Sequence, residues 1–161
     1  MRWDAFVQAC PEIGVPATAR FENDQVLIVA TLRRDGFPRI SPCEPDIVAG
    51  HLMIGMMWRS QKVLDLERDT RVSVHSKVPD REGSEGDIKC YGRAVAIDDP
   101  GLRRAYREAI MRRIDWAPEE PHFHLFSIDV TSAASMRFGD DPTVITWDAV
   151  RGTRTLPFAP P

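Results

Sequence analysis

The chain has 161 residues, of which 43% are hydrophobic and 28% charged, the size of one compact domain with its own core. Its 21 basic and 24 acidic residues give a formal net charge of −3 and alternate along the chain, which disfavours a nucleic-acid binder that works through a basic patch. The three cysteines fit no metal-binding or disulfide pattern, and no segment is apolar enough for a secretion signal or a membrane span. We therefore expect a soluble, cytoplasmic protein with reduced cysteines.

The beginning of the sequence favours two short helices. Apolar residues recur at helical spacing over Trp3–Ala9, which predicts an amphipathic helix that Pro11 interrupts. A second helix is predicted over Pro16–Glu22, because Pro16 suits the first turn of a helix.

Three strands joined by tight turns are predicted next. Gln25–Leu32 is rich in Val, Ile and Leu and is followed by the pair Asp35-Gly36, which is typical of a hairpin turn. The return strand is predicted over Phe37–Val48, and its three prolines indicate an edge strand or one with bulges. Leu52–Met57 is the third strand, so we expect a meander.

A change of period then predicts a helix over Ser60–Asp69. Ser60 is a good N-cap residue, and Asp65 is expected on the polar side of this helix. The alternating pattern of Arg71–Ser76 indicates a strand, and the polar segment Lys77–Gly86 is predicted to be a flexible loop.

The rest of the chain predicts two strands, a helix and a hairpin. Asp87–Ile97 is a strand in which Gly92 indicates a bulge or a close backbone approach. The sequence Asp98-Asp99-Pro100 starts a helix, whose arginines are expected to form a solvated face: Arg103, Arg104, Arg107, Arg112 and Arg113. His124–Phe138 is a long strand, and a terminal hairpin turns at Arg151-Gly152.

Together these elements predict a mainly β protein, a β-barrel with peripheral helices, in which about six antiparallel strands close into a small barrel. The sequence shows neither an internal repeat nor a linker. Residues 1–161 are therefore expected to form a single domain.

The start of the helix at Ser60 carries the pattern most indicative of a ligand. A helix N-terminus presents unpaired N–H groups and a partial positive charge. Here it brings Ser60 and Lys62 into the first turn, directly after Arg59. This corner suits a phosphate, although most serine-capped helices bind nothing.

Ordered motifs extend this interpretation over Val26–Ile97. The sequence reads A-T-L-x-x-D-G-x-P-x-x-S-P from Ala30, then S-x-K-x-x-x-L-x-x-D-x-R-V from Ser60, then G-R-A from Gly92. Taken together, these motifs resemble the amino-terminal core of the pyridoxamine 5′-phosphate oxidase-like, FMN-binding split-barrel family. The resemblance implies a split barrel and a homodimer with two cofactor sites at the subunit interface. The implied cofactor is FMN or, in some relatives, a deazaflavin (coenzyme F-420).

The resemblance also implies which residues hold the cofactor. Ser60 and Lys62 would bind its phosphate, with Arg39 as a further basic contact. Residues of two strands would lie against the isoalloxazine ring or the ribityl chain: Ile40, Ser41, Met56 and Met57. The alternative for the methionines is that they fill the core.

The sequence departs from the family pattern in two places. Gln61 stands where many relatives have a second basic residue, so the phosphate has one cation fewer unless Arg59 supplies it. The segment from Arg151 onward contains no histidine, so the Arg-x-His element that holds the substrate of the true oxidase is absent. We therefore expect a flavin-dependent oxidoreductase that acts on an unknown small molecule, with no catalytic residue identified, and not pyridoxamine phosphate oxidation.

Other functions stay open at this point. A deazaflavin carries an acidic tail, which favours basic residues such as Arg33, Arg34 and Arg59. A flavin- or haem-binding module without turnover is a further alternative. His122 and His124 lack a third ligand at a convincing spacing, so no metal site is expected. In the same way, a hydrogen-bonded structural role is favoured for His75, and Cys43 has no histidine neighbour to make it a nucleophile.

Overall fold

The computed structural model describes residues 1–78 and 80–157. Its strands are β1 (Leu27–Leu32), β2 (Pro38–Cys43), β3 (Pro45–Val48), β4 (His51–Met57), β5 (Arg71–His75), β6 (Asp87–Ala96), β7 (Phe123–Arg137), β8 (Thr143–Asp148) and β9 (Gly152–Leu156). Its helices are α1 (Trp3–Ala9), α2 (Pro11–Asp24), α3 (Gln61–Arg68) and α4 (Pro100–Ile114). None of the helices in these ranges is long and apolar enough to cross a membrane.

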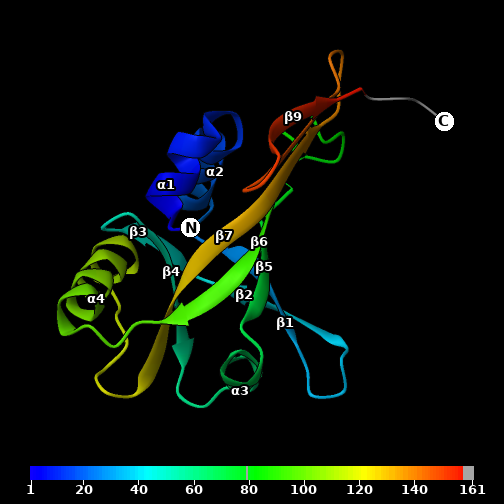
Figure 1. Ribbon diagram of the computed structural model, residues 1–161. Coiled ribbons are helices and arrows are strands. Elements are labelled where there is room, and N and C mark those ends of the chain that lie inside the picture. The colour runs from blue at the N-terminus through cyan, green and yellow to red at the C-terminus, as the bar shows by residue number, and fades with distance from the viewer. Residues whose placement is uncertain (79, 158–161) are drawn as a thin grey trace.

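All of these strands belong to one antiparallel sheet, which divides at β7. The strand order is β2-β1-β5-β6-β7-β4-β3, with β8 on β7 and β9 on β8. One side of β7 pairs with β6, while the other side pairs with β4 along its first part and with β8 along its second part. The β4 branch continues the curved body of the sheet, whereas β8 and β9 form an arm at the top of Figure 1.

The mainly β architecture with peripheral helices is confirmed. The described residues contain nine strands, more than the expected six, because Phe37–Val48 divides in two and the terminal hairpin adds two more. The first helix has the predicted bounds, but the second begins at Pro11 and not at Pro16. The reason is that a first helical residue needs no N–H group, so Pro11 starts a helix as readily as it ends one.

The proline-rich segment divides at Glu44 into β2 and β3, which lie at the two ends of the sheet order. Pro42 and Pro45 flank the division, and each lacks the N–H donor that an interior strand needs. The expected edge position is therefore confirmed. Both expected hairpin pairings form, since β2 pairs with β1 and β3 pairs with β4. The three strands do not lie side by side as a meander, because the return strand is divided between the two ends of the sheet order.

Apolar side chains form two clusters on opposite faces of β4. The larger cluster fills the inside of the sheet and includes Leu52, Ile54 and Met56, together with aromatic residues of α1 and α2. The smaller one lies between β4 and α4 and includes Met53 and Tyr106. The strand that leads into α3 is thus buried on both faces for most of its length, which fixes the position where α3 begins.

The α4 helix begins as predicted, because Asp99 caps it by accepting a backbone N–H at 2.8 Å. The expected solvated arginine face is wrong for some of its members. Arg113 is 3.4 Å from Asp46 of β3, and Arg107 donates to the carbonyl oxygen of Pro118 at 2.7 Å. These arginines tie α4 to the edge strand β3 and to the segment that follows the helix.

Gly92 lies at a bulge, as the sequence predicts. The register between β6 and β7 shifts between Tyr91 and Gly92. A Cβ atom on Gly92 would overlap the backbone carbonyl oxygen of Asp129 on β7. Only glycine allows the two longest paired strands to approach this closely.

We expect the Gly92→Ala substitution to destabilise the protein by about 2–3 kcal/mol, because the strand backbones must separate to admit the methyl group. Urea unfolding should show a lower midpoint with an unchanged slope. Val95→Ala, at a half-exposed position of the same strand, is the control and should cost less. An unchanged midpoint for Gly92→Ala would contradict the close approach.

Candidate functional site

The α3 helix is held against the sheet by a buried carboxylate. Asp65 is 3% exposed, and its Oδ2 atom accepts hydrogen bonds from Thr31 Oγ1 at 2.9 Å and from Arg39 Nε at 2.6 Å. Arg68 donates to the other oxygen at 3.3 Å and to the carbonyl oxygen of Leu32. The expectation that Asp65 lies on the polar side of the helix is therefore wrong, and Asp65 joins α3 to β1 and β2.

The ionised form of Asp65 is the one that the structure stabilises. Burial by itself raises the pKa of this carboxyl group. The hydrogen bonds from Arg39, Thr31 and Arg68 outweigh burial and hold the pKa of Asp65 below its ordinary value. The carboxylate is thus charged at neutral pH, and Arg39 is its main cationic partner.

Residues 59–62, the α3 corner, form the start of the helix. Ser60 precedes α3 as predicted, but its side chain makes no capping hydrogen bond. Its hydroxyl oxygen is buried and has no hydrogen-bond partner within the described residues. The N–H groups of the first turn are therefore not satisfied by a side-chain cap. An orphaned hydroxyl beside such N–H groups is a place where an anion would gain hydrogen bonds.

Lys62 lies in the first turn of α3 and reaches the end of β2. Its Nζ atom is 3.1 Å from Cys43 Sγ and 3.4 Å from the carbonyl oxygen of Pro42. Burial raises the pKa of the Cys43 thiol, although the Lys62 ammonium lowers it, so the sulfur stays protonated at neutral pH and is a poor nucleophile. Because Cys43 is neutral, it leaves the charge of Lys62 available to an anion at the α3 corner.

The residues of β2 divide between two faces, as alternate residues of a strand do. Arg39 faces α3 and is bound to Asp65, and Ser41 is half-buried on the same side. Ile40 is 70% exposed on the opposite face. The structure thus brings Arg39 close to the helix of the α3 corner and turns Ile40 away from it.

Met56 and Met57 are separated in the same way. Met56 is 3% exposed and belongs to the inner core cluster, whereas Met57 is 76% exposed. The side chain of Met56 therefore fills the core, which was the alternative for these residues. The two methionine side chains do not form one wall for a ring, because neighbouring strand residues point to opposite faces.

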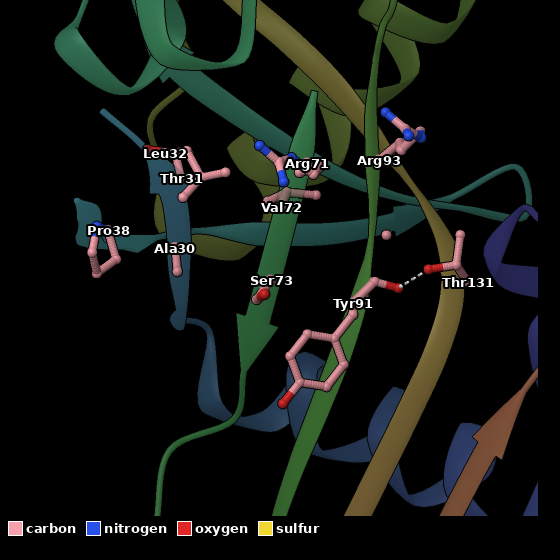
Figure 2. A pocket seen from close by; sticks show the side chains of 11 residues that line it. Ala30, Thr31, Leu32, Pro38, Arg71, Val72, Ser73, Tyr91, Arg93 and Thr131 are labelled. Atoms are coloured by element: carbon pink, nitrogen blue, oxygen red, sulfur yellow. Dashed lines mark hydrogen bonds between the residues drawn. The ribbon is translucent and has the colours of Figure 1, made fainter. Parts of the chain in front are cut away.

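The outer face of β1, β5 and β6 has a shallow hollow of about 470 Å³. Figure 2 shows Arg71 and Arg93 at one end of it and the ring of Tyr91 toward the other. Arg71 donates to Asp69 at 2.6 Å and lowers the pKa of Asp69 to about 2. Thr131 donates to the carbonyl oxygen of Tyr91 at 3.1 Å. The hollow therefore has a cationic end and an aromatic end.

His75 and His124 make contacts of a structural kind. His75 Nδ1 lies 2.6 Å from the carbonyl oxygen of Ser76, and its Nε2 lies 3.5 Å from Asp87. His124 stacks on Trp58 with ring centroids 4.7 Å apart. Within residues 1–78 and 80–157, no group of three or more His, Cys, Asp or Glu side chains could hold a metal ion.

The divided antiparallel sheet, with helices at its periphery, is the split barrel of pyridoxamine 5′-phosphate oxidase-like proteins. The split-barrel prediction is thus confirmed. No protein-family model and no curated protein matches the sequence, so the fold is known from solved structures of low sequence identity.

Three such structures illustrate the likeness. A candidate pyridoxamine 5′-phosphate oxidase from Listeria innocua has 17% identity and a TM-score of 0.62, over 73% of this chain and 92% of that one. PhzG from Burkholderia lata, in complex with tetrahydrophenazine-1-carboxylic acid, has 14% identity and a TM-score of 0.63, over 98% and 93%. A heme-binding protein from Mycobacterium smegmatis has 16% identity and a TM-score of 0.64, over 80% of this chain and 55% of that one.

We expect Asp65→Asn to lower the free energy of unfolding at neutral pH by about 2–3 kcal/mol, because the substitution removes the charge that Arg39 and Arg68 neutralise. Glu67→Gln, on the exposed side of the same helix, should change it by less than about 0.5 kcal/mol. Urea unfolding of both variants measures the difference. Equal effects of the two substitutions would contradict the role of Asp65.

The contribution of Asp65 also has a defined pH dependence. The pKa of Asp65 is lower in the folded protein than the ordinary value of 3.8. The stabilisation is therefore complete above the ordinary pKa and is lost as the pH falls through the pKa of the folded protein. The stability difference between the parent and Asp65→Asn should therefore be constant from about pH 7 to pH 5 and should shrink below about pH 4. A difference that grows toward acid would contradict the sign of the shift.

Proposed function

We propose that the protein is a flavin-binding split barrel that holds FMN by its phosphate at the α3 corner and acts as an oxidoreductase on a small molecule. The observation that carries the proposal is the buried Ser60 hydroxyl, which has no partner among the described residues and lies two residues before Lys62. In this fold, an uncapped helix start with a cation is a fitting place for a phosphate. Arg59, exposed in the preceding turn, is close enough in sequence to add a second positive charge.

The residues of the chain would bind and position the cofactor. Ser60 and the first N–H groups of α3 would donate hydrogen bonds to phosphate oxygens, and Lys62 would balance the charge. Arg39 would contribute through its remaining N–H groups, since its Nε atom is bonded to Asp65. When bound, FMN supplies the hydride or electron transfer, and the protein contributes its orientation and electrostatic surroundings.

The proposal includes a homodimer in which the cofactor lies at the subunit interface. The face of the sheet made by β2, β1, β5 and β6 supports the dimer, because large apolar side chains stand exposed there. Ile40 is 70% exposed and Tyr91 is 44% exposed on this face, next to the hollow of Figure 2. Apolar groups of this size on one sheet face favour a second protein surface.

We expect Lys62→Ala to weaken FMN binding by about one to two orders of magnitude, since a hydrogen bond to a charged group contributes about 1.5–3 kcal/mol. Fluorescence titration of cofactor-free protein with FMN measures this change. Folding should hardly change, because the Lys62 side chain is partly exposed and lies outside the apolar core.

The matched control is Arg104→Ala, which removes an exposed cation from α4 and should leave FMN affinity unchanged. Parallel titrations with a deazaflavin and with haem distinguish the alternative cofactors. If Lys62→Ala binds FMN as tightly as the parent protein, the phosphate is not held at the α3 corner.

We expect Ile40→Glu to shift the protein from dimer to monomer, because it places a carboxylate of each subunit in an apolar contact between the two subunits. Sedimentation velocity at several protein concentrations measures the shift. Met111→Glu, at a 47% exposed position on α4, should leave the dimer intact. A parent protein that is monomeric at all concentrations would contradict the interface.

A further inference from the structure

A second concave site lies on the other side of β4 from the barrel core, between this strand and α4. It is a cavity of about 180 Å³. Aromatic side chains of four segments line it: Trp58, Tyr106, Trp116 and Phe123. Met56 and Met57 also border it, so it adjoins the strand end that leads to the α3 corner.

The back of the cavity is rigid. The Gly55 N–H group donates to the hydroxyl oxygen of Tyr106 at 2.9 Å, and a Cβ atom on Gly55 would come within 2.5 Å of that oxygen. Tyr106 itself is 3% exposed and stacks on Phe123 with ring centroids 6.3 Å apart. Glycine at position 55 thus lets the phenol of α4 reach the strand and form the inner wall.

The outer wall is held in place from behind by arginines. Arg107 donates to the carbonyl oxygen of Pro118 at 2.7 Å, and Arg103 donates to that of Phe123 at 3.1 Å. Arg103 is also paired with Glu120 through two hydrogen bonds, of 3.0 and 2.8 Å. The segment after α4 is therefore fixed, and the positive charges that fix it are used outside the cavity.

The charge at the mouth of the cavity is negative. Glu44 and Glu119 are exposed residues of its lining, and neither carboxylate has a hydrogen bond or ion pair within the described residues. The lining contains no lysine or arginine. Burial raises the pKa of Tyr106, and the nearby Glu44 and Asp46 carboxylates add to the rise, so the phenol stays neutral and does not add to this charge.

The mouth also exposes large aromatic side chains. Trp58 is 52% exposed and Trp116 is 55% exposed. Indole rings attract cations through their faces, and the ring of Phe123 already has the guanidinium of Arg103 at 4.2 Å from its centroid. His124 stacks on Trp58, so Trp116 is the indole ring for which the described residues show no such partner. A half-exposed indole beside carboxylates that are unpaired within the described residues suits a ligand that is both flat and positively charged.

We propose that this cavity binds a small aromatic amine in its protonated form. Its size fits a single ring, since cavities of about 150 Å³ bind benzene in other proteins. The ring would lie among Trp58, Trp116 and Phe123, and the ammonium group would face Glu44 and Glu119. The inference rests on the proposed function in one respect only: the amine is a substrate if a flavin is held at the neighbouring α3 corner.

Calorimetric titration of FMN-free protein with benzylamine, benzyl alcohol and benzoate tests the proposal. These probes share one ring and differ in charge. Benzylamine should bind with a dissociation constant of about 1 mM or below, and at least about tenfold more tightly than benzoate. Benzyl alcohol should lie between the two. Equal binding of the amine and the carboxylate would overturn the proposal. The absence of saturable amine binding would also overturn it, including when a second copy of the chain covers the cavity.

Variants locate the binding to this cavity. Trp116→Ala should weaken benzylamine binding about tenfold and Trp116→Phe much less, because phenylalanine keeps a ring face. Glu44→Gln should weaken it about three- to fivefold without changing benzyl alcohol binding. Glu108→Gln, at an exposed position of α4 outside the cavity, is the matched control and should have no effect. Amine binding that Trp116→Ala and Glu44→Gln leave unchanged would show that the amine binds elsewhere.

The same protein titrated with FMN separates the two proposals. Amine binding without FMN binding would remove the proposed function and leave the amine site standing. FMN binding without amine binding would remove the amine site and leave the proposed function standing.

Discussion

The buried carboxylate of Asp65 is the interaction on which the arrangement of the α3 corner depends. It is one charge, largely buried, that receives donors from β1, β2 and α3. A buried charge is stable only when its partners are in place, so the position of α3, and with it the direction of its first N–H groups, follows from these contacts. The proposed phosphate site uses the first turn of the same helix, before Asp65. Its geometry therefore depends on an ion pair whose Arg39 is also a proposed contact of the phosphate.

The two faces of β4 explain why concave sites lie on both sides of this strand. One face belongs to the barrel core and leads through Met56 to the α3 corner. The other is covered by α4, whose Tyr106 approaches because Gly55 has no side chain. In the part of the chain that the structure describes, the strand thus separates a corner with uncapped N–H groups and a lysine from a cavity with unpaired carboxylates. Opposite charges across a single strand allow two ligands of opposite charge to approach each other without competing for one site.

Much of the fold could be predicted from local signals in the sequence, since the Asp35-Gly36 turn and the Asp99 cap depend on neighbouring residues only. The bulge could be predicted from a glycine inside a strand pattern, although the residue that Gly92 approaches is on β7. The burial of Asp65 could not, because its partners Thr31 and Arg39 are 34 and 26 residues away, and nothing in the helix distinguishes it from a solvated aspartate. The same holds for Arg113, whose partner Asp46 lies on a distant strand. The position of Ser60 followed from the sequence, but the direction of its hydroxyl is set by packing. The opposite directions of Met56 and Met57, by contrast, follow from strand geometry alone and could have been foreseen.

The prolines of β2 have a consequence for how molecules of this protein can meet. β2 ends the sheet order and pairs with β1 on one side only, so the missing donors of Pro38 and Pro42 fall on its free side. At the alternate positions Pro38, Ile40 and Pro42, an N–H group would point outward, and only Ile40 has such a group. A strand from another chain would find too few donors to extend the sheet, which protects this edge against fibril-like growth. Two copies of the chain can therefore meet on this side through the face of the sheet and not through its edge, and face-to-face contact can form a closed dimer.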